Sequence, residues 1–439
     1  MIPRRSSCIV RYLFCIIVVL VILLFINLNQ QQSLKRALFT EIPDSAKAYI
    51  LFEEEKTVDF NITDLKRLIK RRNEEEHIHN IDVFGKITSN INIIVIRVDK
   101  FSERLKLLLA SLSAVKGIQD VLIIFSHSFF DENVNRIVEK IDFCRVLQIF
   151  YPFSLQLHPD DFPGFHSQDC PYDLDVYTAK YLKCTGASNP DIHGRYRKPE
   201  NAQMKHHWWW TANKVFDNIS CLERNNGVVM FMDDDNFLLE DFMYLVIYMK
   251  KVANSMPFCE IISLGVYDPQ VKFTNENDTY RLQITTWDPK YSEVIGFDYS
   301  TWNTLASHFD LYCLLDDYSW SRSIQYISLN RLDGKRFKVI SSVMPRSFKS
   351  SCGLKTVTQC GVNEGIFEAL SIHKQQKKNL FPPYFEVYSH IELIDDEYII
   401  FDVMENNGGW NDNRDKDLCN TMTIHKVKKI LLDMKYQLE

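Results

Sequence analysis

The chain lacks three features that mark common functional classes: an excess of basic residues, segments of low complexity, and any Cys-x-x-Cys pair. Because its net charge at pH 7 is −6, it has no overall positive field, and we expect no nucleic-acid partner. Its 439 residues are 46% hydrophobic and 25% charged, which is enough to bury a large core in one large domain or two fused ones. The 11 cysteines lack metal-type spacing and favour disulfides.

Residues 8–26 form an apolar run that only Arg11 interrupts. This run is long enough to cross a bilayer, and no small-residue cleavage site follows it. An uncleaved anchor is therefore favoured over a removable signal peptide or a buried core helix. Basic residues lie mostly before the run, which predicts a cytosolic N-terminus and a lumenal remainder. The sequence thus predicts a cytosolic tail over residues 1–7 and a transmembrane anchor over residues 8–27, the arrangement of a single-pass type II membrane protein.

A lumenal location permits both disulfides and glycosylation. Only Cys8 and Cys15 of the 11 cysteines lie in the predicted anchor, so the others are in a compartment that allows disulfides to form. Three Asn-x-Ser/Thr sequons begin at Asn61, Asn218 and Asn277 and fit the same topology.

Two segments with different patterns follow the anchor. Residues 28–88 are polar, rich in charge and spaced as helices, which predicts a stem. From residue 91 strands and helices alternate with short loops, the pattern of right-handed βαβ units on a parallel sheet. Residues 89–439 are therefore predicted to form an α/β domain with a mostly parallel sheet flanked by helices. The first predicted strands cover residues 91–96, 121–125 and 146–150, and the helices between them cover residues 103–114 and 133–141.

Asp233, Asp234 and Asp235 close a short apolar run over residues 227–232. Such a run predicts a buried strand that delivers the three carboxylates to the carboxyl edge of the sheet, where α/β folds bind ligands. Three adjacent carboxylates repel one another unless a cation holds them, and a hard divalent metal prefers oxygen ligands. The triplet therefore suggests metal-assisted glycosyl transfer with a sugar nucleotide, and a solvated acidic turn is the alternative.

Residues 203–210 read Gln-Met-Lys-His-His-Trp-Trp-Trp, and helical character continues over residues 211–216. Three adjacent tryptophans on a helix cannot all face one core, so some of them must contact a neighbouring element or a ligand. Lys205, His206 and His207 carry the hydrogen-bond donors that a phosphate or a sugar requires. Residue types alone favour the plainer interpretation, with the tryptophans in the core and the histidines bonded within the protein.

The same block resembles the Gln-Thr-Lys-His-His-Trp-Trp-Trp block of the N-acetylglucosaminyltransferase II family, the alpha-1,6-mannosyl-glycoprotein 2-beta-N-acetylglucosaminyltransferases of the Golgi. The resemblance continues over residues 93–419, and so many segments in one order indicate common ancestry. The further segments that carry it are residues 117–127, 146–157, 161–164, 263–265 and 407–410, with Asp412, Arg414 and Asp415.

The resemblance implies a Rossmann-like fold of the GT-A class, an anchor in the Golgi membrane and manganese as cofactor. The implied reaction moves N-acetylglucosamine from UDP-N-acetylglucosamine to the 2-hydroxyl of an alpha-1,6-arm mannose on an N-glycan, with inversion. Such a transfer needs a cation on the departing UDP, hydrogen-bond donors on the diphosphate and a base for the attacking hydroxyl.

Site residues follow from the resemblance by position. Asp235 matches the metal-binding acid that ends the family's acidic triplet, and Tyr267, Tyr318 and Trp320 fall where the family contacts the acceptor. The residues that match the nucleotide-sugar block are Gln203, Met204, Lys205, His206 and His207, together with Asp233 and Asp234. The resemblance also implies three disulfides, Cys170–Cys184, Cys313–Cys419 and Cys352–Cys360.

The position of the catalytic base departs from the family pattern. The family has an acid directly after the first tryptophan of its Asp-Asp-Tyr-Asn-Trp-Asp-Trp motif, whereas this chain has Ser321 after Trp320. A serine cannot accept the proton of a mannose hydroxyl at neutral pH. Asp316 and Asp317 are the candidate substitutes.

The second metal ligand of the family is a histidine after Pro-Arg-x-Phe, and this chain has Lys349 there. An ammonium group offers no lone pair to a metal and repels a cation. Where the family has the donor loop Gln-Val-His-Asn-Arg-Pro, this chain has Arg-Val-Asp-Lys-Phe-Ser over residues 97–102. Lys349 is instead suited to neutralise the diphosphate directly, together with Arg97 and Lys100 from this altered loop.

Two hypotheses about function therefore stand. The first is a working N-acetylglucosaminyltransferase with a relocated base. The second is a catalytically silent homologue that acts as a Golgi binding protein. An active transferase with a changed donor or acceptor is a further, weaker alternative.

Overall fold

The structure is a computed structural model that describes residues 29, 47–56, 60–223, 225–256, 259–266, 276–330, 335–350, 362–389 and 407–423. The predicted tail and the whole of the predicted anchor lie outside these residues. Within the described part of the chain, no helix is long and apolar enough to span a bilayer.

A ten-stranded sheet forms the centre of the described structure, in the order β1-β4-β3-β2-β5-β9-β7-β10-β8-β12. Neighbours β4, β3, β2 and β5 are all parallel, and β7 pairs with β10 and β8 with β12 in parallel as well. The other pairings are antiparallel. The bounds are β1 Ile78–His79, β2 Ile93–Val98, β3 Leu122–His127, β4 Arg145–Phe150, β5 Val229–Asp233, β7 Ile261–Gly265, β8 Arg281–Thr286, β9 Val294–Phe297, β10 Lys338–Ser342 and β12 Glu386–Ser389.

The predicted alternation of strands and helices is confirmed. β2, α5, β3, α6 and β4 follow one another as βαβ units on parallel strands, and α5 has the predicted bounds. The Ser102 side chain caps α5 because it accepts a hydrogen bond from the Leu105 N–H at 3.1 Å. The helix bounds in this part are α2 Lys47–Ile50, α3 Ile62–Glu75, α4 Ile81–Phe84, α5 Glu103–Ala114 and α6 Glu132–Glu139.

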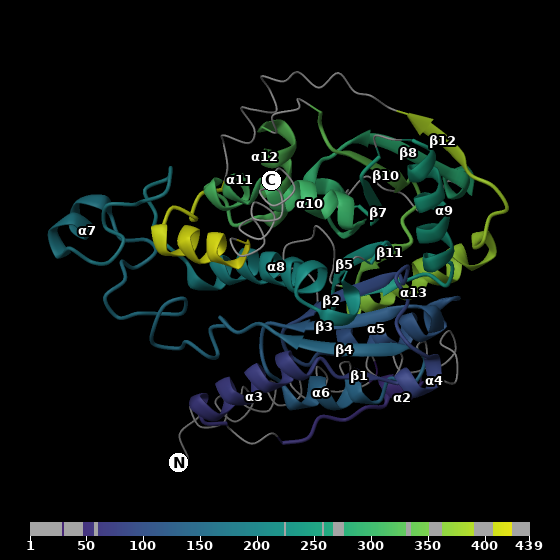
Figure 1. Cartoon of the computed structure of the whole chain (residues 1–439), viewed down its shortest axis with the longest axis horizontal. Helices are drawn as coiled ribbons and strands as arrows, with labels where there is room; N and C mark the ends of the chain where they lie inside the picture. The colour runs from purple at the N-terminus through teal and green to yellow at the C-terminus, as the bar shows by residue number, and fades with distance from the viewer. Residues whose placement is uncertain are drawn as a thin grey trace, which may run out of the picture.

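Helices cover both faces of the sheet, as Figure 1 shows. Alternate side chains of β2 point to opposite faces, so Ile94 and Ile96 pack with α5, α6 and α9, whereas Ile93 and Val95 pack with α8 and the helices α10 to α12. Both faces of the central strands are therefore core. The bounds of these helices are α8 Pro199–Asp217, α9 Phe242–Ser255, α10 Tyr299–Ser307, α11 Phe309–Leu314 and α12 Trp320–Asn330.

Part of the predicted stem packs onto the domain. β1 pairs with β4, and the α3 side chain of Asn73 exchanges two hydrogen bonds with the Phe150 backbone, at 2.7 and 2.8 Å. Leu65 and Ile69 lie one helical turn apart on α3 and are buried against Phe150. The fold therefore includes α3, because this charge-rich helix has an apolar side.

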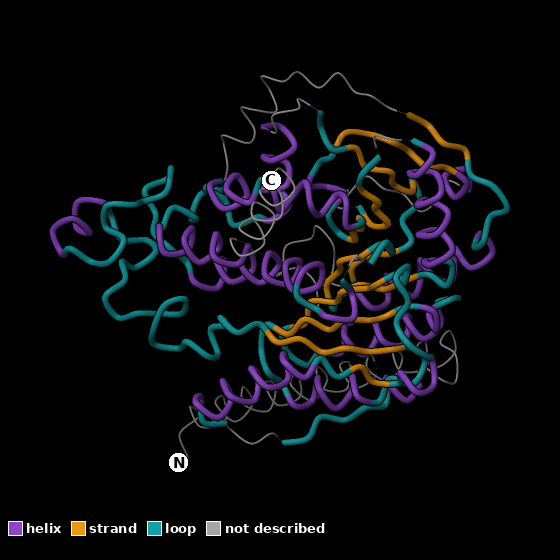
Figure 2. Tube along the Cα trace, viewed as in Figure 1, coloured by secondary structure: helices purple, strands orange, loops and turns teal. Residues whose placement is uncertain are grey.

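Residues 151–198 make a long connection from β4 to α8 that consists mostly of loop (Figure 2). It contains the short helix α7 Val176–Leu182, at the left of Figure 1. The predicted disulfide Cys170–Cys184 closes this segment. The predicted disulfide Cys313–Cys419 joins α11 to the helix over residues 413–423. The predicted pair Cys352–Cys360 lies outside the described residues.

Candidate active site

The acidic triplet lies at the carboxyl edge of the sheet, as predicted. β5 ends at Asp233, and Asp234 and Asp235 form the turn that leads into the short strand β6 Asn236–Leu238. The parallel pairing of β2 with β5 places Arg97 directly beside Asp233. The carboxyl ends of neighbouring parallel strands are the usual ligand-binding edge of an α/β sheet.

A two-stranded ribbon brings Lys349 to the same turn. Strand β11 Ser347–Lys349 pairs antiparallel with β6, and Lys349 is the partner of Asn236. The turn is fixed further because the Asn236 side chain accepts a hydrogen bond from the Asp233 N–H at 3.1 Å, and the Ser350 N–H donates to the Asp235 carbonyl at 2.7 Å. Lys349 is thus held in place by backbone pairing.

Two cations and two carboxylates meet at this point. The Lys349 ammonium lies 2.9 Å from Asp233 Oδ2 and also contacts Asp235 Oδ1, while the Arg97 guanidinium contacts Asp233 Oδ1. Burial alone would raise the pKa of Asp233, but the charges of Arg97 and Lys349 outweigh it and hold this pKa well below its usual value. Burial, with the Asp235 and Asp233 charges, raises the pKa of Asp234 to about 7.

These groups open onto a cleft of about 740 Å³, a volume typical of small-molecule sites. The cleft holds three cationic side chains beside five carboxylates, so it is suited to a charged ligand. Its lining residues are Arg97, Val98, Asp99, Lys100, Ser128, Phe129, Leu155, Gln156, Glu200, Gln203, Met204, His207, Asp233, Asp234, Asp235 and Lys349.

Helix α8 divides the predicted nucleotide-sugar residues between the cleft and the core. Gln203, Met204 and His207 line the cleft, and Gln203 is fixed because its Oε1 accepts a hydrogen bond from the Leu155 N–H at 2.6 Å. His207 Nε2 lies 2.8 Å from Ser126 Oγ on β3. Burial, and secondarily the Arg97 charge, lowers the pKa of His207 far below its usual value, so its ring is neutral at pH 7.

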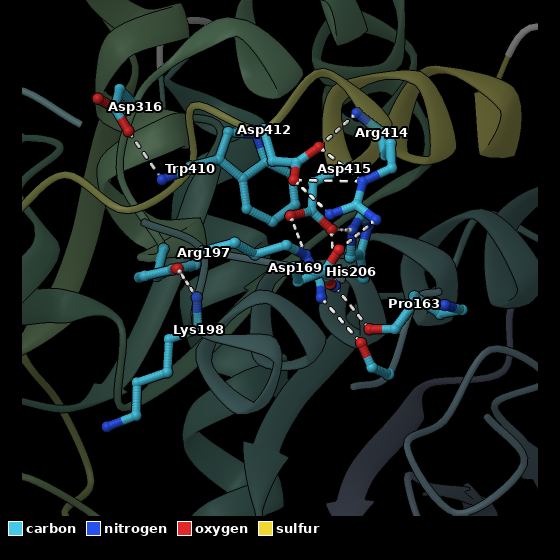
Figure 3. A network of polar contacts seen from close by, with 12 residues as sticks. Pro163, Asp169, Arg197, Lys198, His206, Asp316, Trp410, Asp412, Arg414 and Asp415 are labelled. Atoms are coloured by element: carbon cyan, nitrogen blue, oxygen red, sulfur yellow. Dashed lines mark hydrogen bonds and ion pairs between the residues drawn. The ribbon is translucent and has the colours of Figure 1, made fainter. Parts of the chain in front are cut away.

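Lys205 and His206 lie outside the cleft lining, in the core. The Lys205 ammonium donates to the carbonyls of Leu315 and Asp317 at 3.0 and 2.8 Å. His206 Nε2 lies 3.0 Å from Asp415, whose carboxylate also forms a two-pronged ion pair with Arg197 (Figure 3). These two α8 side chains therefore hold residues 315–317 and the helix over residues 413–423 against α8, which agrees with the plainer interpretation of the block.

Two of the three tryptophans of the block lie in the core, as the residue types suggest. Trp208 and Trp209 are fully buried, and Trp210 packs on Tyr151 at the side of the helix. Trp320, one of the predicted acceptor residues, stacks on Trp208 with 4.4 Å between ring centroids.

Tyr318 and Tyr267 are the other two predicted acceptor residues. The Tyr318 hydroxyl accepts a hydrogen bond from the Lys198 N–H at 2.7 Å, and its ring meets Trp410 edge-on. Tyr267 lies outside the described residues. Neither Tyr318 nor Trp320 is among the residues that line the cleft of the acidic triplet.

Three residues around the family's base position have structural partners. Ser321 is buried, with its hydroxyl 3.0 Å from Ser319 Oγ. The buried Asp317 carboxylate accepts hydrogen bonds from the Ser319 and Asn407 backbones at 2.7 and 3.0 Å.

The Asp316 carboxylate accepts a hydrogen bond from the Trp410 N–H at 2.7 Å, as Figure 3 shows. Asp316, Asp317 and Ser321 are not among the residues that line the cleft of the acidic triplet. Both aspartates therefore anchor residues 407–410.

Three carboxylates near the triplet were not singled out from the sequence. Asp99 and Glu200 line the cleft from the loop after β2 and from the first turn of α8. Glu293 is buried beside Asn236, and burial raises its pKa to about 8 although the Lys349 charge opposes this. Asp99 could have been predicted as a site residue because it follows a predicted strand, whereas no local pattern distinguishes Glu293.

Fold and site together define an α/β protein with a charged ligand cleft at the carboxyl edge of its central strands. The family model of N-acetylglucosaminyltransferase II (MGAT2) matches residues 66–419. The chain belongs to this family.

Named relatives agree with the family match. The alpha-1,6-mannosyl-glycoprotein 2-beta-N-acetylglucosaminyltransferase of Sus scrofa is 31% identical over 382 residues, which are 86% of this chain and 83% of the relative. The Homo sapiens protein of that name is 31% identical over 81% of this chain and 78% of its own length. The Arabidopsis thaliana protein is 32% identical over 55% of this chain and 54% of its own.

Solved structures give weaker matches. Mouse xyloside xylosyltransferase 1 in its apo form aligns at 12% identity over 68% of this chain and 84% of its own, with a TM-score of 0.26. The mannosyltransferase Ktr4p of S. cerevisiae in complex with GDP aligns at 10% identity over 78% of each chain, with a TM-score of 0.20. At these TM-scores neither overlay defines the fold.

Proposed function

We propose that this chain is a glycosyltransferase of GT-A type, anchored in the Golgi membrane as a single-pass type II protein. Its proposed reaction moves N-acetylglucosamine from UDP-N-acetylglucosamine to the 2-hydroxyl of an alpha-1,6-arm mannose on an N-glycan of a glycoprotein. The observation that carries the proposal is the cleft at the carboxyl edge of β2 and β5, which gathers Arg97, Lys349 and the acidic triplet in a chain of this family.

The donor occupies this cleft in the proposal. Arg97, Lys100 and Lys349 line it and match the charge of a diphosphate. The neutral His207 and the fixed Gln203 lie on the α8 wall of the same cleft and are suited to polar contacts with the uridine or the sugar.

The transfer is a displacement at the anomeric carbon of the sugar. The oxygen of the mannose 2-hydroxyl forms the new bond from the face opposite the diphosphate, and the bond to the diphosphate oxygen breaks with its electron pair. The hydroxyl proton passes to a base. Because Asp316 and Asp317 are bonded to residues 407–410, we propose that the base is one of the cleft carboxylates Asp99, Glu200 or Asp234.

A silent Golgi binding protein is the second candidate function. It is favoured by one observation: Ser321 stands at the family's base position and is buried against Ser319, while the neighbouring aspartates anchor a loop. A chain with this function would keep the fold and the cleft without transferring sugar.

A transfer assay separates the two candidates. Full-length protein in detergent is incubated with UDP-N-acetylglucosamine, manganese and a mannose-terminated N-glycan, and the product is read by mass spectrometry and NMR. The proposal predicts one added N-acetylglucosamine on the 2-hydroxyl of an alpha-1,6-arm mannose. It also predicts a loss of rate of about 100-fold or more in one of the variants Asp99→Asn, Glu200→Gln or Asp234→Asn. Absence of product, with UDP still bound, would support the silent protein instead.

A further inference from the structure

Lys349 lies between two carboxylates of the acidic triplet. Its Nζ atom is 2.9 Å from Asp233 Oδ2 and also contacts Asp235 Oδ1. Its side chain is only 10% exposed, and the pairing of β11 with β6 brings it there from the opposite strand. Because pairing and burial both fix it, Lys349 is a built part of the site and not a surface lysine that happens to lie nearby.

Arg97 adds the second cation from a different element. Its guanidinium contacts Asp233 Oδ1, and the register of β2 on β5 places the two residues side by side. Asp233 and Asp235 therefore meet two positive charges that belong to the chain itself. The repulsion between Asp233 and Asp235, which suggested a metal from sequence alone, is relieved within the protein.

The same arrangement does not fit the manganese that the family implies. Across the described residues, no group of three or more His, Cys, Asp or Glu side chains can hold a metal ion. A divalent cation needs lone pairs from several ligands, whereas the Lys349 ammonium has three N–H donors and no lone pair. A metal bound to Asp233 and Asp235 would also meet the ammonium charge at short range.

We propose that Lys349 is the built-in cation of this site and takes the place of the divalent metal. The contacts of Lys349 are our reason to exclude manganese from this site. That the ligand is the diphosphate of UDP rests on the proposed function. When the bond between the sugar and the diphosphate breaks, the electron pair goes to the diphosphate. Lys349 and Arg97 stabilise the new negative charge, and Lys100 also lines the cleft.

The first test needs no nucleotide. Full-length protein in detergent is titrated with manganese(II) alone, and bound ion is measured by electron paramagnetic resonance. Wild-type protein is expected to bind no manganese at the triplet. The variant Lys349→His, which gains a lone pair and loses the charge, is expected to bind manganese at the triplet stoichiometrically. Stoichiometric manganese binding by the wild type that Asp235→Asn abolishes would overturn the proposal.

The second test measures the diphosphate. UDP binding to the same protein is followed by calorimetry in EDTA and again in manganese, with Lys349→Met and Lys290→Met as a matched pair. Lys290 is an exposed lysine away from the cleft. The affinity of the wild type is expected to be the same in both buffers, to fall about tenfold or more in Lys349→Met, and to be unchanged in Lys290→Met.

Two results of the second test contradict different claims. UDP binding by the wild type only in manganese would overturn the replacement of the metal by Lys349, while the proposed donor would stand. If UDP binds in neither buffer, the proposed donor is wrong, and the manganese titration alone then supports or overturns the role of Lys349.

Discussion

Asp415 shows how a single buried carboxylate joins distant parts of the chain. It accepts two hydrogen bonds from Arg197, at 2.6 and 3.0 Å, and lies 3.0 Å from His206 on α8. All three side chains are buried. Burial alone would raise the pKa of Asp415, but the His206 hydrogen bond and the Arg197 charge outweigh it and lower this pKa. Asp415 therefore ties the helix over residues 413–423 to α8 through the His206 hydrogen bond, and to Arg197, just before α8, through an ion pair.

Asp415→Asn is expected to lower the free energy of unfolding by about 3–5 kcal/mol, because it leaves the buried Arg197 charge without its partner. The exposed neighbour Asp417 provides the control, and Asp417→Asn should change stability by about 0.5 kcal/mol or less. Urea unfolding of the full-length protein measures both values. Equal stability of the two variants would show that Asp415 does not hold the helix.

His127 makes stability depend on pH. Burial lowers its pKa to about 3, well below the value of about 6.5 in an unfolded chain. As pH falls below 6.5 the unfolded chain takes up a proton that the folded chain does not. The free energy of unfolding therefore falls by about 1.4 kcal/mol per pH unit from this residue. In urea unfolding between pH 6 and 4, the slope for His127→Leu should be smaller by this amount. An unchanged slope would contradict the buried, neutral histidine.

Helix α3 is the element that the sequence places in the stem and the structure places on the sheet. Its outward side is charged, but Leu65 and Ile69 share one side and are buried, and Asn73 pairs with both backbone groups of Phe150. Few side chains attach α3 to the rest of the domain, so each of them contributes a large part of the free energy of this attachment.

Asn73→Ala is expected to destabilise the docking of α3 by about 2 kcal/mol, because it leaves the N–H and C=O of Phe150 without these hydrogen bonds. Limited proteolysis within α3 should become faster, and the urea midpoint should fall. Lys70→Ala, on the exposed side of the same helix, serves as the control, since its ion pair with Glu74 is solvent-exposed and long at 3.9 Å. Equal proteolysis of the two variants would mean that α3 is held by other contacts.

Local patterns predicted the elements of the sheet well. The bounds of α5 were found as predicted because a leucine-rich run and the cap at Ser102 are both encoded within a few neighbouring residues. The end of β5 at Asp233 was likewise visible, since clustered acids stop an apolar run.

Contacts between distant segments were beyond such patterns. Lys349 and Asp233 are 116 residues apart, and only the pairing of β11 with β6 brings them together. The side chains of α8 were also hard to assign, because a helix turns Lys205 and His206 into the core while it leaves Gln203 and His207 on the cleft. The resemblance to a family located the block, and the structure separated its two roles.

At the scale of the whole molecule, the domain brings together at one cleft groups that lie far apart in the sequence. β2 supplies Arg97, β5 supplies Asp233, α8 supplies His207, and the β6–β11 ribbon supplies Lys349. Among the described residues, one disulfide closes the loop over residues 170–184. The disulfide Cys313–Cys419 and the Arg197–Asp415 ion pair hold the helix over residues 413–423 in place. In the proposed function this cleft is the donor site, and the cation that we propose for it belongs to the chain.

The most direct test of this account is the initial rate of N-acetylglucosamine transfer to a mannose-terminated N-glycan by the full-length protein, measured in EDTA and in manganese. We expect product in both buffers at similar rates, because Lys349 and Arg97 supply the charge that a metal would bring. Product in manganese alone, or no product in either buffer, would contradict it.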